Sequence, residues 1–569
     1  MQKLTLLISF TCLLLPLQVF AESQRISDFA LIDHQGGFHQ LSQYANRDAV
    51  VIFVQANGDK ASHTGIEQLK NLRTEFANNA VEFFLLNAMP GDNRDSVQIE
   101  ATENAIDFPI LMDDAQLVAE LLGVTTTGEA FVINPKSKEI VYHGPISANA
   151  DSNINSKGNE QSFLADSLRS LIAGQVATFN PPPVKGKKIN YPQKQQHLTK
   201  TPSYQNDIVP ILQERCIACH QEGGLAPWAM SSHQMIQGWA PMIRETVMTK
   251  RMPPGQIDNF NLDNFVDVHH ITPQEQATLI HWIDAGAPMN GKSDPLTKFV
   301  ADARTWQLGE PDLIVDVPPQ DVPASGVVDY RYIPVELGLT ENKWLRGYEF
   351  FIDQKPVLHH IIAFSEDSTN PGRRQLLGGY GPGKEPRFLP DNTGVLLTPT
   401  TRFVMQIHYT TNGRAAVDNS KLALYFSDKK PTYQFQNVNA VNFNFVIPPN
   451  EQDFPTKAAF TLKGDAYLYF FSPHMHFRGK RMDYTAVYPD GHEEWLINIP
   501  NYRFDWQMDY QLKEPKLLPA GTRIIANGAF DNSAMNAFNP DPSQSVKWGE
   551  QTWEEMFIGF VGIAYTNGE

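Results

Sequence analysis

The period of the apolar positions changes along this chain and divides it into regions. In residues 25–178, continuous apolar and β-branched runs at 49–54, 81–87 and 129–134 predict buried strands. A helical pattern over 64–78 and further helical stretches separate these runs. Strands that alternate with helices in this way predict an α/β domain built around a central sheet.

The next two regions lack this alternation. Residues 179–201 are rich in Pro and Lys without periodicity, which predicts a semi-extended linker. Residues 202–290 carry helical patterns and predict a small, compact all-α domain. Its last helix is expected to begin at Thr272, with Glu275 completing a capping box, and to stop at Gly286.

From Trp306 onward the pattern is that of a β-sandwich. Short strands with alternating apolar and polar positions are separated by turns that contain Gly, Pro or Asn. At 569 residues, the chain is long enough for three or four domains that each bury a core. We therefore expect a multidomain protein with α/β, all-α and all-β parts.

Residues 1–21 are predicted to be a cleavable signal peptide. Lys3 supplies the positive start, Leu4–Leu17 the apolar stretch and Val19–Ala21 the small-residue cleavage site. Cys12 lies inside the apolar stretch and would leave with the peptide. No later apolar run is long enough to span a bilayer. The mature protein is therefore expected to be periplasmic or secreted.

The net charge narrows the choice of partners. A formal charge of -17 at pH 7 argues against nucleic acid or an anionic membrane as the partner.

The strongest single motif is the run from Cys216 through Cys219 to His220. This C-x-x-C-H spacing is the one used for covalent attachment of c-type haem, in which two thiols bind the vinyl groups and the histidine binds the iron. A zinc site would need a second ligand pair, and a dithiol site would need a thioredoxin-like context around the motif; neither is present. We expect one covalently bound haem c.

Met252 is the expected sixth ligand of that haem. It stands in the stretch 250–255, which resembles the Met-Pro loop of small cytochromes c, and a thioether ligand would raise the reduction potential. The competing residues are Met230, Met235, Met242, Met248, His269, His270 and His281.

Histidines in the β-rich region are few and clustered. Of the six histidines after Val300, five fall in three groups: His359 with His360, His408, and His474 with His476. On a strand, residues two apart share a face, so the last two imidazoles can reach one metal ion. A single such pair would be unremarkable, but three groups in one region predict a metal protein.

Four stretches around these histidines together resemble the copper type II, ascorbate-dependent monooxygenases, the peptidylglycine and dopamine hydroxylase family. The stretches are 357–362, 404–411, 472–479 and 553–557, and their order and approximate spacing fit. The resemblance implies two β-sandwich domains, 305–430 and 431–569, with a copper ion in each. The family's disulfides are missing, so packing alone would hold these sandwiches.

Carried over to this chain, the resemblance implies one copper held by His359, His360 and His408, and a second, oxygen-binding copper held by His474, His476 and Met556. Met475, Met482 and Met535 are alternatives to Met556. Two imidazoles with a soft thioether suit Cu(I). Neighbouring residues face opposite ways on a regular strand, so a strand end or bulge is expected at His359 and His360. His492, in a turn, is expected to be solvated.

The first domain resembles the thioredoxin/peroxiredoxin superfamily at residues 29–37 and 124–134. The loop at 55–63 holds no cysteine where that superfamily places its nucleophile, and Gly128 stands at the cis-proline position. Thiol chemistry needs a thiolate. The domain is therefore expected to be redox-inactive and to serve as a docking or assembly module for a protein partner, with His63 solvated.

The expected function is a copper monooxygenase that uses O2 to hydroxylate a C–H bond of a small organic substrate. In the resembling family ascorbate supplies electrons one at a time; here we expect the haem, or another one-electron donor, to deliver them. The alternatives are a non-catalytic redox or copper-binding electron-transfer protein and an assembly factor.

The substrate is not fixed by the sequence. Ser472, Ile558 and Phe560 stand where the peptide-amidating branch has Arg, Asn and Tyr, which argues against a glycine-extended peptide. Phe470, Phe471, Phe477 and Phe560 favour an apolar or aromatic substrate, or else are core residues.

Overall fold

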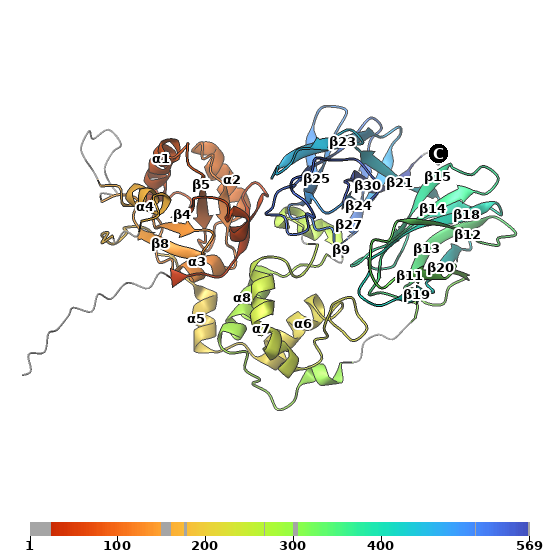
Figure 1. Cartoon of the computed structure of the whole chain (residues 1–569), viewed down its shortest axis with the longest axis horizontal. Coiled ribbons are helices and arrows are strands. Elements are labelled where there is room, and N and C mark those ends of the chain that lie inside the picture. Colours follow the sequence, from red (N-terminus) through yellow and green to blue (C-terminus); the bar gives the residue numbers. More distant parts are fainter. Residues whose placement is uncertain are drawn as a thin grey trace, which may run out of the picture.

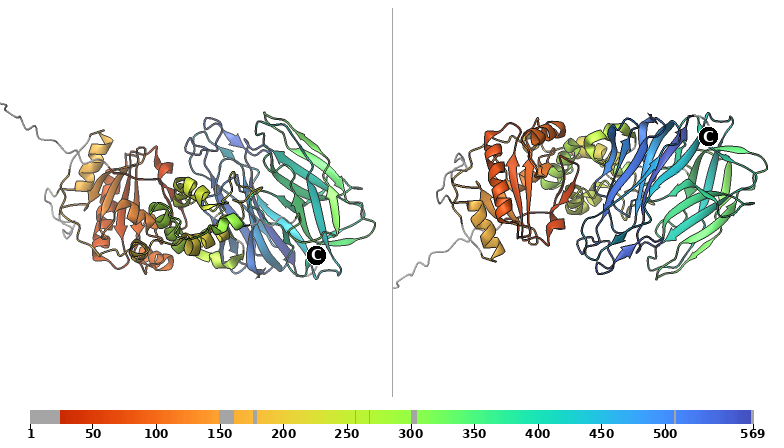
Figure 2. Two further views of the ribbon diagram at one scale, coloured as in Figure 1. Left: turned by 90° about the horizontal axis from the view of Figure 1, so that it is seen from below. Right: turned by 90° about the horizontal axis from the view of Figure 1, so that it is seen from above.

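The computed structural model describes residues 24–148, 161–175, 179–255, 257–266, 268–299, 305–506 and 508–566. The predicted signal peptide and Cys12 lie outside these ranges. An α/β part forms one end of the molecule, a helical part lies in the middle and two β-sandwiches form the other end (Figures 1 and 2).

The α/β part contains an eight-stranded sheet with the order β1-β8-β7-β4-β5-β6-β2-β3. The central strands β4, β5 and β6 are parallel, and β7 runs antiparallel to β4. The strands are β1 Gln24–Arg25, β2 Ala30–Asp33, β3 Phe38–Gln40, β4 Ala49–Gln55, β5 Val81–Asn87, β6 Ile110–Met112, β7 Ala130–Asn134 and β8 Glu139–Gly144. The buried strands predicted at 49–54, 81–87 and 129–134 are confirmed as β4, β5 and β7.

The helices of this part are α1 Lys60–Glu75, α2 Arg94–Glu103, α3 Leu117–Leu122 and α4 Phe163–Ile172, with a short 3-10 helix at Leu41–Tyr44. The helix predicted at 64–78 is α1, which begins four residues earlier. The reason is an N-cap: the Asp59 carboxylate accepts a hydrogen bond from the Ser62 backbone N–H at 3.0 Å.

The stretch 179–201, predicted to be a semi-extended linker, is partly ordered structure. The backbone N–H of Thr127 donates to the Lys187 carbonyl and that of Ile189 donates to the Thr125 carbonyl, which attaches the stretch to the α/β part. Helix α5, Pro192–Thr199, follows and packs against α8, Pro273–Asp284. The prediction of a linker was therefore wrong for Pro192–Thr199, where Pro192 occupies the first turn of a helix, a position that proline favours.

The helical part, 202–299, shares one apolar core with the α/β part, formed among others by Leu117, Val118, Leu212, Met248 and Trp282. Its helices are α6 Val209–Arg215, α7 His233–Met248 and α8, with a π-helical turn at Tyr204–Ile208 and 3-10 turns at Asn259–Asn264 and Pro295–Lys298. The predicted capping box at the start of α8 is confirmed.

The helical part also contributes a strand to the β-rich region. Strand β9, Phe265–Val266, pairs with β27, Tyr510–Leu518. Phe265 is buried and packs near Phe471, with 6.3 Å between the ring centroids. Residues 257–266 therefore belong to the core of the β-rich region, which a domain boundary at 290 does not capture.

A ten-stranded sheet runs through both β-sandwiches, with the order β10-β20-β13-β17-β21-β30-β24-β27-β9 and with β16 paired to β13. The two halves join through the parallel pair of β17 and β21 at Thr393–Tyr433 and Gly394–Gln434. These strands are β10 Leu313–Asp316, β13 Lys343–Phe351, β16 Arg387–Phe388, β17 Thr393–Leu397, β20 Lys421–Ser427, β21 Tyr433–Val441, β24 Ala466–Met475 and β30 Phe557–Tyr565.

A four-stranded sheet covers each half and encloses a separate core. The first has the order β12-β18-β14-β15, and the second β23-β28-β25-β26. Their strands are β12 Arg331–Glu336, β14 Leu358–Asp367, β15 Arg374–Tyr380, β18 Thr401–Tyr409, β23 Phe454–Thr461, β25 Gly479–Val487, β26 Glu493–Ile499 and β28 Arg523–Phe530. Short pairs β11 Gln320–Val322 with β19 Ala416–Asp418, and β22 Val446–Ile447 with β29 Val546–Lys547, complete the region.

Asp258 joins all three parts at one point. Its Oδ1 lies 2.5 Å from Nη1 of Arg94 in the α/β part, and its Oδ2 accepts from Nδ2 of Asn498 in the second sandwich at 3.1 Å. The same Nδ2 donates to the carbonyl of Gly36 at 2.9 Å. Asp258 is almost fully buried, so this junction fixes the three parts relative to one another.

No helix in the described ranges is both long enough and apolar enough to cross a membrane.

Candidate functional site

Three histidines of the first sandwich converge at the ends of β14 and β18. His360 and His408 are paired directly across the two strands, and the register shifts between Leu358 and His360. The predicted bulge is thus confirmed, and it lets two neighbouring histidines face one point. One ring nitrogen from each of His359, His360 and His408 lies within 4.8 Å of the others, the one such His, Cys, Asp or Glu group found in the described ranges.

This group suits a metal ion that prefers imidazole. Burial lowers the pKa of His359 to about 4 and that of His408 to about 3, and it holds the pKa of His360 well below its usual range. The rings are therefore neutral, with lone pairs available to a metal. Nδ1 of His408 is buried without a hydrogen-bond partner, an unsatisfied polar atom that a bound ion would satisfy.

Tyr330 lies beside these histidines and was not identified from the sequence. Its ring centroid is 4.7 Å from that of His408 and 5.6 Å from that of His360. Nothing in the local sequence signals this contact, because the strand pairing that creates it is long-range.

The second group lies on β24 of the second sandwich. His474 and His476 are two residues apart, with ring centroids separated by 5.3 Å. Met475, the last residue of β24, pairs with Phe557, the first residue of β30, and His476 and Met556 adjoin this pair just outside the two strands. Met556 and His476 therefore lie at the same end of this pair of strands. The alternatives Met475 and Met482 are fully buried in the core.

A buried carboxylate organises the chain around this group. Glu555 accepts hydrogen bonds from the backbone N–H groups of His476 at 2.8 Å and Arg478 at 2.6 Å. Burial raises the pKa of Glu555 to about 8, although these donors and the Arg478 guanidinium lower it. Arg478 is itself buried and donates to Asn532 and to the Trp553 carbonyl. The segment that carries Met556 is therefore tied to the segment that carries His476.

The two histidine groups face each other across the contact between the sandwiches. A pocket of about 70 Å³ is lined by His360 from one group and His474 from the other. Its walls are mostly apolar. A polar group also lines it: Nζ of Lys384 lies 3.4 Å from Oγ of Ser472 and 2.8 Å from Oδ1 of Asp509. The remaining lining residues include Tyr348, Ile361, Ile362, Leu376, Tyr380, Asn437, Phe470 and Phe560.

The phenylalanines singled out from the sequence have different roles. Phe470 and Phe560 line the pocket, whereas Phe471 is a core residue. Phe477 packs against Phe504, with 4.9 Å between the ring centroids. His492 is exposed in its turn, as predicted.

The C-x-x-C-H motif follows α6. Cys216 and Cys219 are half-buried and not joined to each other, and the backbone N–H groups of Cys219 and His220 both donate to the Cys216 carbonyl. Nδ1 of His220 lies 3.1 Å from the carbonyl oxygen of Trp228. This contact orients the imidazole and leaves Nε2 for a metal, which suits a haem ligand.

The candidates for the sixth ligand differ in their surroundings. Met252 is half-buried just after α7, and its backbone N–H donates a hydrogen bond to the carbonyl oxygen of Thr246. Met230 and Met248 are buried core residues, whereas Met235 and Met242 are exposed. Nε2 of His281 lies 3.2 Å from Oε1 of Glu120. Nδ1 of His270 lies 3.0 Å from the carbonyl oxygen of Val268.

The loop that follows the C-x-x-C-H motif touches the first sandwich. Nζ of Lys355 donates to the Gly223 carbonyl at 3.2 Å. Lys355 lies between β13 and β14, four residues before His359. On the motif itself, burial and the Glu385 carboxylate raise the pKa of the Cys219 thiol.

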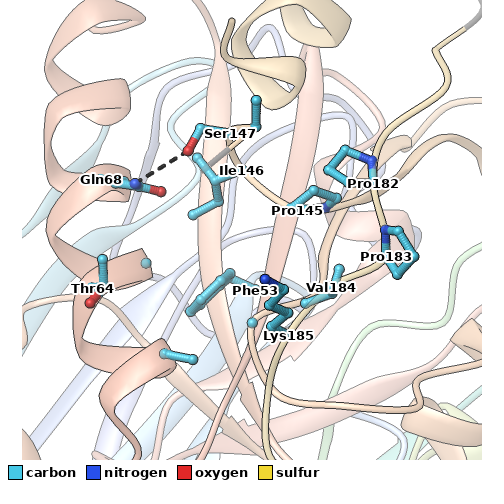
Figure 3. Close-up of a pocket in the computed structure, with 14 residues that line it drawn as sticks. Phe53, Thr64, Gln68, Pro145, Ile146, Ser147, Pro182, Pro183, Val184 and Lys185 are labelled. Carbon is cyan, nitrogen blue, oxygen red and sulfur yellow. Dashed lines mark hydrogen bonds between the residues drawn. The ribbon is translucent and has the colours of Figure 1, made fainter. Parts of the chain in front are cut away.

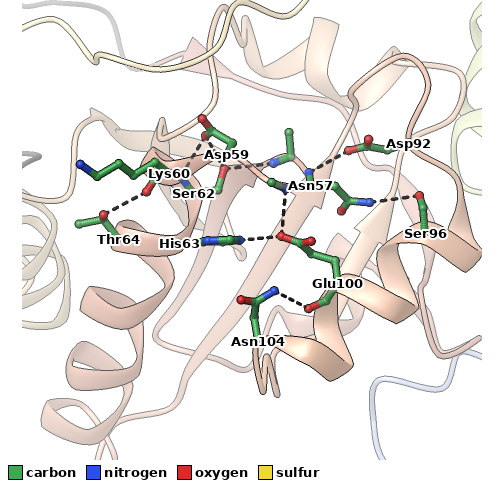
Figure 4. A network of polar contacts seen from close by, with 12 residues as sticks. Asn57, Asp59, Lys60, Ser62, His63, Thr64, Asp92, Ser96, Glu100 and Asn104 are labelled. Atoms are coloured by element: carbon green, nitrogen blue, oxygen red, sulfur yellow. Dashed lines mark hydrogen bonds and ion pairs between the residues drawn. The ribbon is translucent and has the colours of Figure 1, made fainter.

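In the α/β part, a network of polar contacts joins the loop after β4 to α1 and α2 (Figure 4). Nε2 of His63 lies 2.6 Å from Oε1 of Glu100, so this histidine is paired and not simply solvated as expected. The backbone N–H of Gly58 donates to the same carboxylate oxygen at 3.0 Å. Asn57 donates from its backbone to Asp92 at 3.0 Å.

A pocket of about 380 Å³ adjoins the first turns of α1 and Gly128 (Figure 3). Part of its wall is Pro182, Pro183 and Val184, from the stretch expected to be a linker. The chain therefore covers part of the face on which the loop after β4 meets Gly128.

Residues 23–143 match the model of the AhpC/TSA family. This stretch contains no cysteine. The α/β part is a thioredoxin-like domain. The match covers this domain alone and does not extend to the helical or β-rich parts.

Three solved structures are similar to part of the chain. A hypothetical protein from Sinorhizobium meliloti is 21% identical, with coverage of 31% of this chain and 96% of that one and a TM-score of 0.26. An uncharacterized conserved protein from Geobacillus kaustophilus is 23% identical, with coverage of 31% and 94% and a TM-score of 0.26. The peroxidoxin BcpB from Mycobacterium tuberculosis is 19% identical, with coverage of 26% and 96% and a TM-score of 0.22. No curated protein matches the chain.

Proposed function

We propose that this protein is an exported, copper-dependent monooxygenase that hydroxylates a C–H bond of a small organic substrate with O2. The observation that carries the proposal is the pair of histidine groups on facing β-sandwiches, three imidazoles on one and two on the other. The two donor sets differ in softness, as expected for two copper ions with different tasks.

His359, His360 and His408 would hold one copper, and His474, His476 and Met556 the other. Bound copper supplies one-electron redox chemistry and a site for dioxygen. The chain's own residues orient the donors: the Glu555 carboxylate fixes the backbone at His476, and the bulge in β14 aligns His359 with His360.

The pocket between the groups supports a small, largely apolar substrate. Phe470 and Phe560 offer apolar walls, and His474 borders the same space. Lys384 and Ser472 provide a polar end that would orient a substrate with one polar group. Closely packed walls also exclude water from the reacting C–H bond.

Electron delivery through a haem on Cys216 and Cys219 completes the proposal. Inserting one oxygen atom into a C–H bond and reducing the other to water consumes two electrons beyond those of the bond. The contact of Lys355 with Gly223 brings the haem-attachment loop close to the strand that carries His359. The first sandwich is therefore the expected entry point for electrons, with ascorbate or another one-electron donor as the external source.

Metal analysis of copper-reconstituted mature protein is the first test. We expect two coppers and one iron per chain. Substrate-dependent O2 uptake, screened with small apolar and aromatic compounds, should disappear in Met556→Ala and persist in Met289→Ala, a change at an exposed methionine. Full copper loading without O2 uptake for any compound would favour an electron-transfer protein. Uptake unchanged in Met556→Ala would contradict the assignment of the oxygen site.

A further inference from the structure

The segment 500–506, between β26 and β27, is anchored to the strand that carries His474 and His476. The Tyr502 hydroxyl donates to the Met475 carbonyl at 2.7 Å and accepts from the Met475 backbone N–H at 3.0 Å. Met475 is the residue between the two histidines. The backbone N–H of Tyr502 also donates to the Lys480 carbonyl at 2.9 Å. The segment therefore keeps a fixed position relative to the second histidine group.

Two residues after this anchor, Phe504 lies between the two histidine groups. Its ring is stacked on His359 of the first sandwich, with 4.8 Å between centroids and 18° between planes. The same ring meets His476 of the second sandwich edge-on, with 6.0 Å between centroids. Phe504 is 6% exposed. One buried ring thus contacts a candidate metal ligand from each sandwich.

The chain beyond Phe504 is fixed against the helical part. Met508 packs so closely on Gly255 that a Cβ added to Gly255 would lie 2.6 Å from Cγ of Met508. The Tyr510 hydroxyl donates to the Gly255 carbonyl at 3.0 Å. Phe504 is therefore held from both directions along the chain, by Tyr502 and by Met508.

We propose that Phe504 is a positioning residue that holds His359 and His476, and with them the two metal sites, at one separation within the frame given by the sheet. This inference rests on the proposed function, because it assumes that both histidine groups hold copper. A phenylalanine that merely filled core volume would be equally buried but would not determine the distance between the two groups. The stacking on His359 and the edge contact with His476 are what tie the ring to that distance.

The test compares Phe504→Ala and Phe504→Leu with a matched control, Phe445→Ala. Phe445 is also buried in the second sandwich, where it packs on Phe530. The readout is the dipolar distance distribution between the two Cu(II) ions, measured by pulsed electron paramagnetic resonance on frozen, oxidised protein. We expect a narrow distribution in the unsubstituted protein and in Phe445→Ala, a broad one in Phe504→Ala and an intermediate one in Phe504→Leu.

A narrow, unshifted distribution in both Phe504 variants would overturn the inference while leaving the proposed function intact. A lack of bound copper in the unsubstituted protein would instead contradict the proposed function. In that case the metal-free protein still tests the packing of Phe504 on His359, from which the inference starts. Carbethoxylation of His359 by diethyl pyrocarbonate should become several-fold faster in Phe504→Leu than in Phe445→Ala, because the covering ring is lost. Equal rates would overturn it.

Discussion

The buried carboxylate of Glu555 accepts a hydrogen bond from the backbone N–H of His476, with 2.8 Å between nitrogen and oxygen. Its other oxygen accepts from the Arg478 backbone N–H at 2.6 Å. Glu555 immediately precedes Met556, so one buried side chain joins the two segments that would supply the second copper site.

Replacing Glu555 with Ala should therefore destabilise the protein and weaken that site. Two buried N–H groups would lose their acceptor, at about 1–3 kcal/mol for each. We expect a lower thermal midpoint for the metal-free protein and loss of about one copper per chain, the first site being retained. Glu555→Gln keeps one acceptor oxygen, so its thermal midpoint and copper content should lie between those of Glu555→Ala and the unsubstituted protein. Glu493→Ala, at an exposed position, serves as the control; equal copper content in Glu555→Ala and Glu493→Ala would contradict this role.

The junction at Asp258 predicts a large effect on stability. Asp258→Asn leaves the guanidinium of Arg94, which is 16% exposed, without its charged partner. Removing one member of a buried ion pair costs about 3–5 kcal/mol. Asp107→Asn removes the partner of Arg73 in an exposed pair, for which about 1 kcal/mol or less is expected. Thermal unfolding followed by circular dichroism should separate the two variants clearly, and coinciding midpoints would show that the junction contributes little.

Asp113 should make the stability of the thioredoxin-like domain depend on pH. Burial raises its pKa from 3.8 to about 7, with Asp114 and Glu120 adding to the rise, while the backbone N–H groups of Ala119 and Val118 lower it. Because the folded state holds this proton more tightly than the unfolded state, the stabilisation is complete below about pH 4 and is lost as the pH rises through about 7. The full contribution is up to about 4 kcal/mol.

In Asp113→Asn this loss should be absent. Denaturant unfolding of the two proteins across the interval from about pH 4 to about pH 8 should therefore give curves that converge or cross, whereas Asp107→Asn should parallel the unsubstituted protein over most of that interval. Half-buried Lys250 faces the same carboxylates, and its positive charge favours their ionised form. Parallel pH profiles for the Asp113→Asn variant and the unsubstituted protein would contradict the assignment.

The haem segment allows a spectroscopic prediction. If Met252 is the sixth ligand, Met252→Ala should alter the absorption spectrum of the haem and lower its reduction potential, because the thioether that favours the reduced iron is lost. Met235→Ala, at an exposed methionine, should leave both unchanged. An unaltered spectrum in Met252→Ala would show that another residue is the ligand.

The sequence predicted those features of the fold that depend on residues close together in the chain. The strands β4, β5 and β7 are continuous apolar runs, and the capping box of Thr272 and Glu275 depends on residues three apart. The bulge at His359 was required if neighbouring histidines were to bind the same metal ion.

Long-range contacts were not predictable in this way. Strand β9 joins a sheet whose other strands lie far along the chain, and residues 187–189 attach to a loop about 60 positions earlier. The same applies to Tyr330 beside His408 and to Phe504 between the histidine groups, because aromatic side chains give no sequence signal of what they pack against. The candidate metal ligands could be identified because histidines are scarce, whereas the residues that position them could not.

The parallel pairing of Thr393 with Tyr433 and of Gly394 with Gln434 has a consequence for motion. A hinge between the two sandwiches would have to break main-chain hydrogen bonds within a continuous sheet, which is costly compared with shifting side chains or loops. Entry to the space between the histidine groups should therefore depend on local fluctuations at its rim, such as rotamer changes of Lys384, and not on one sandwich opening away from the other.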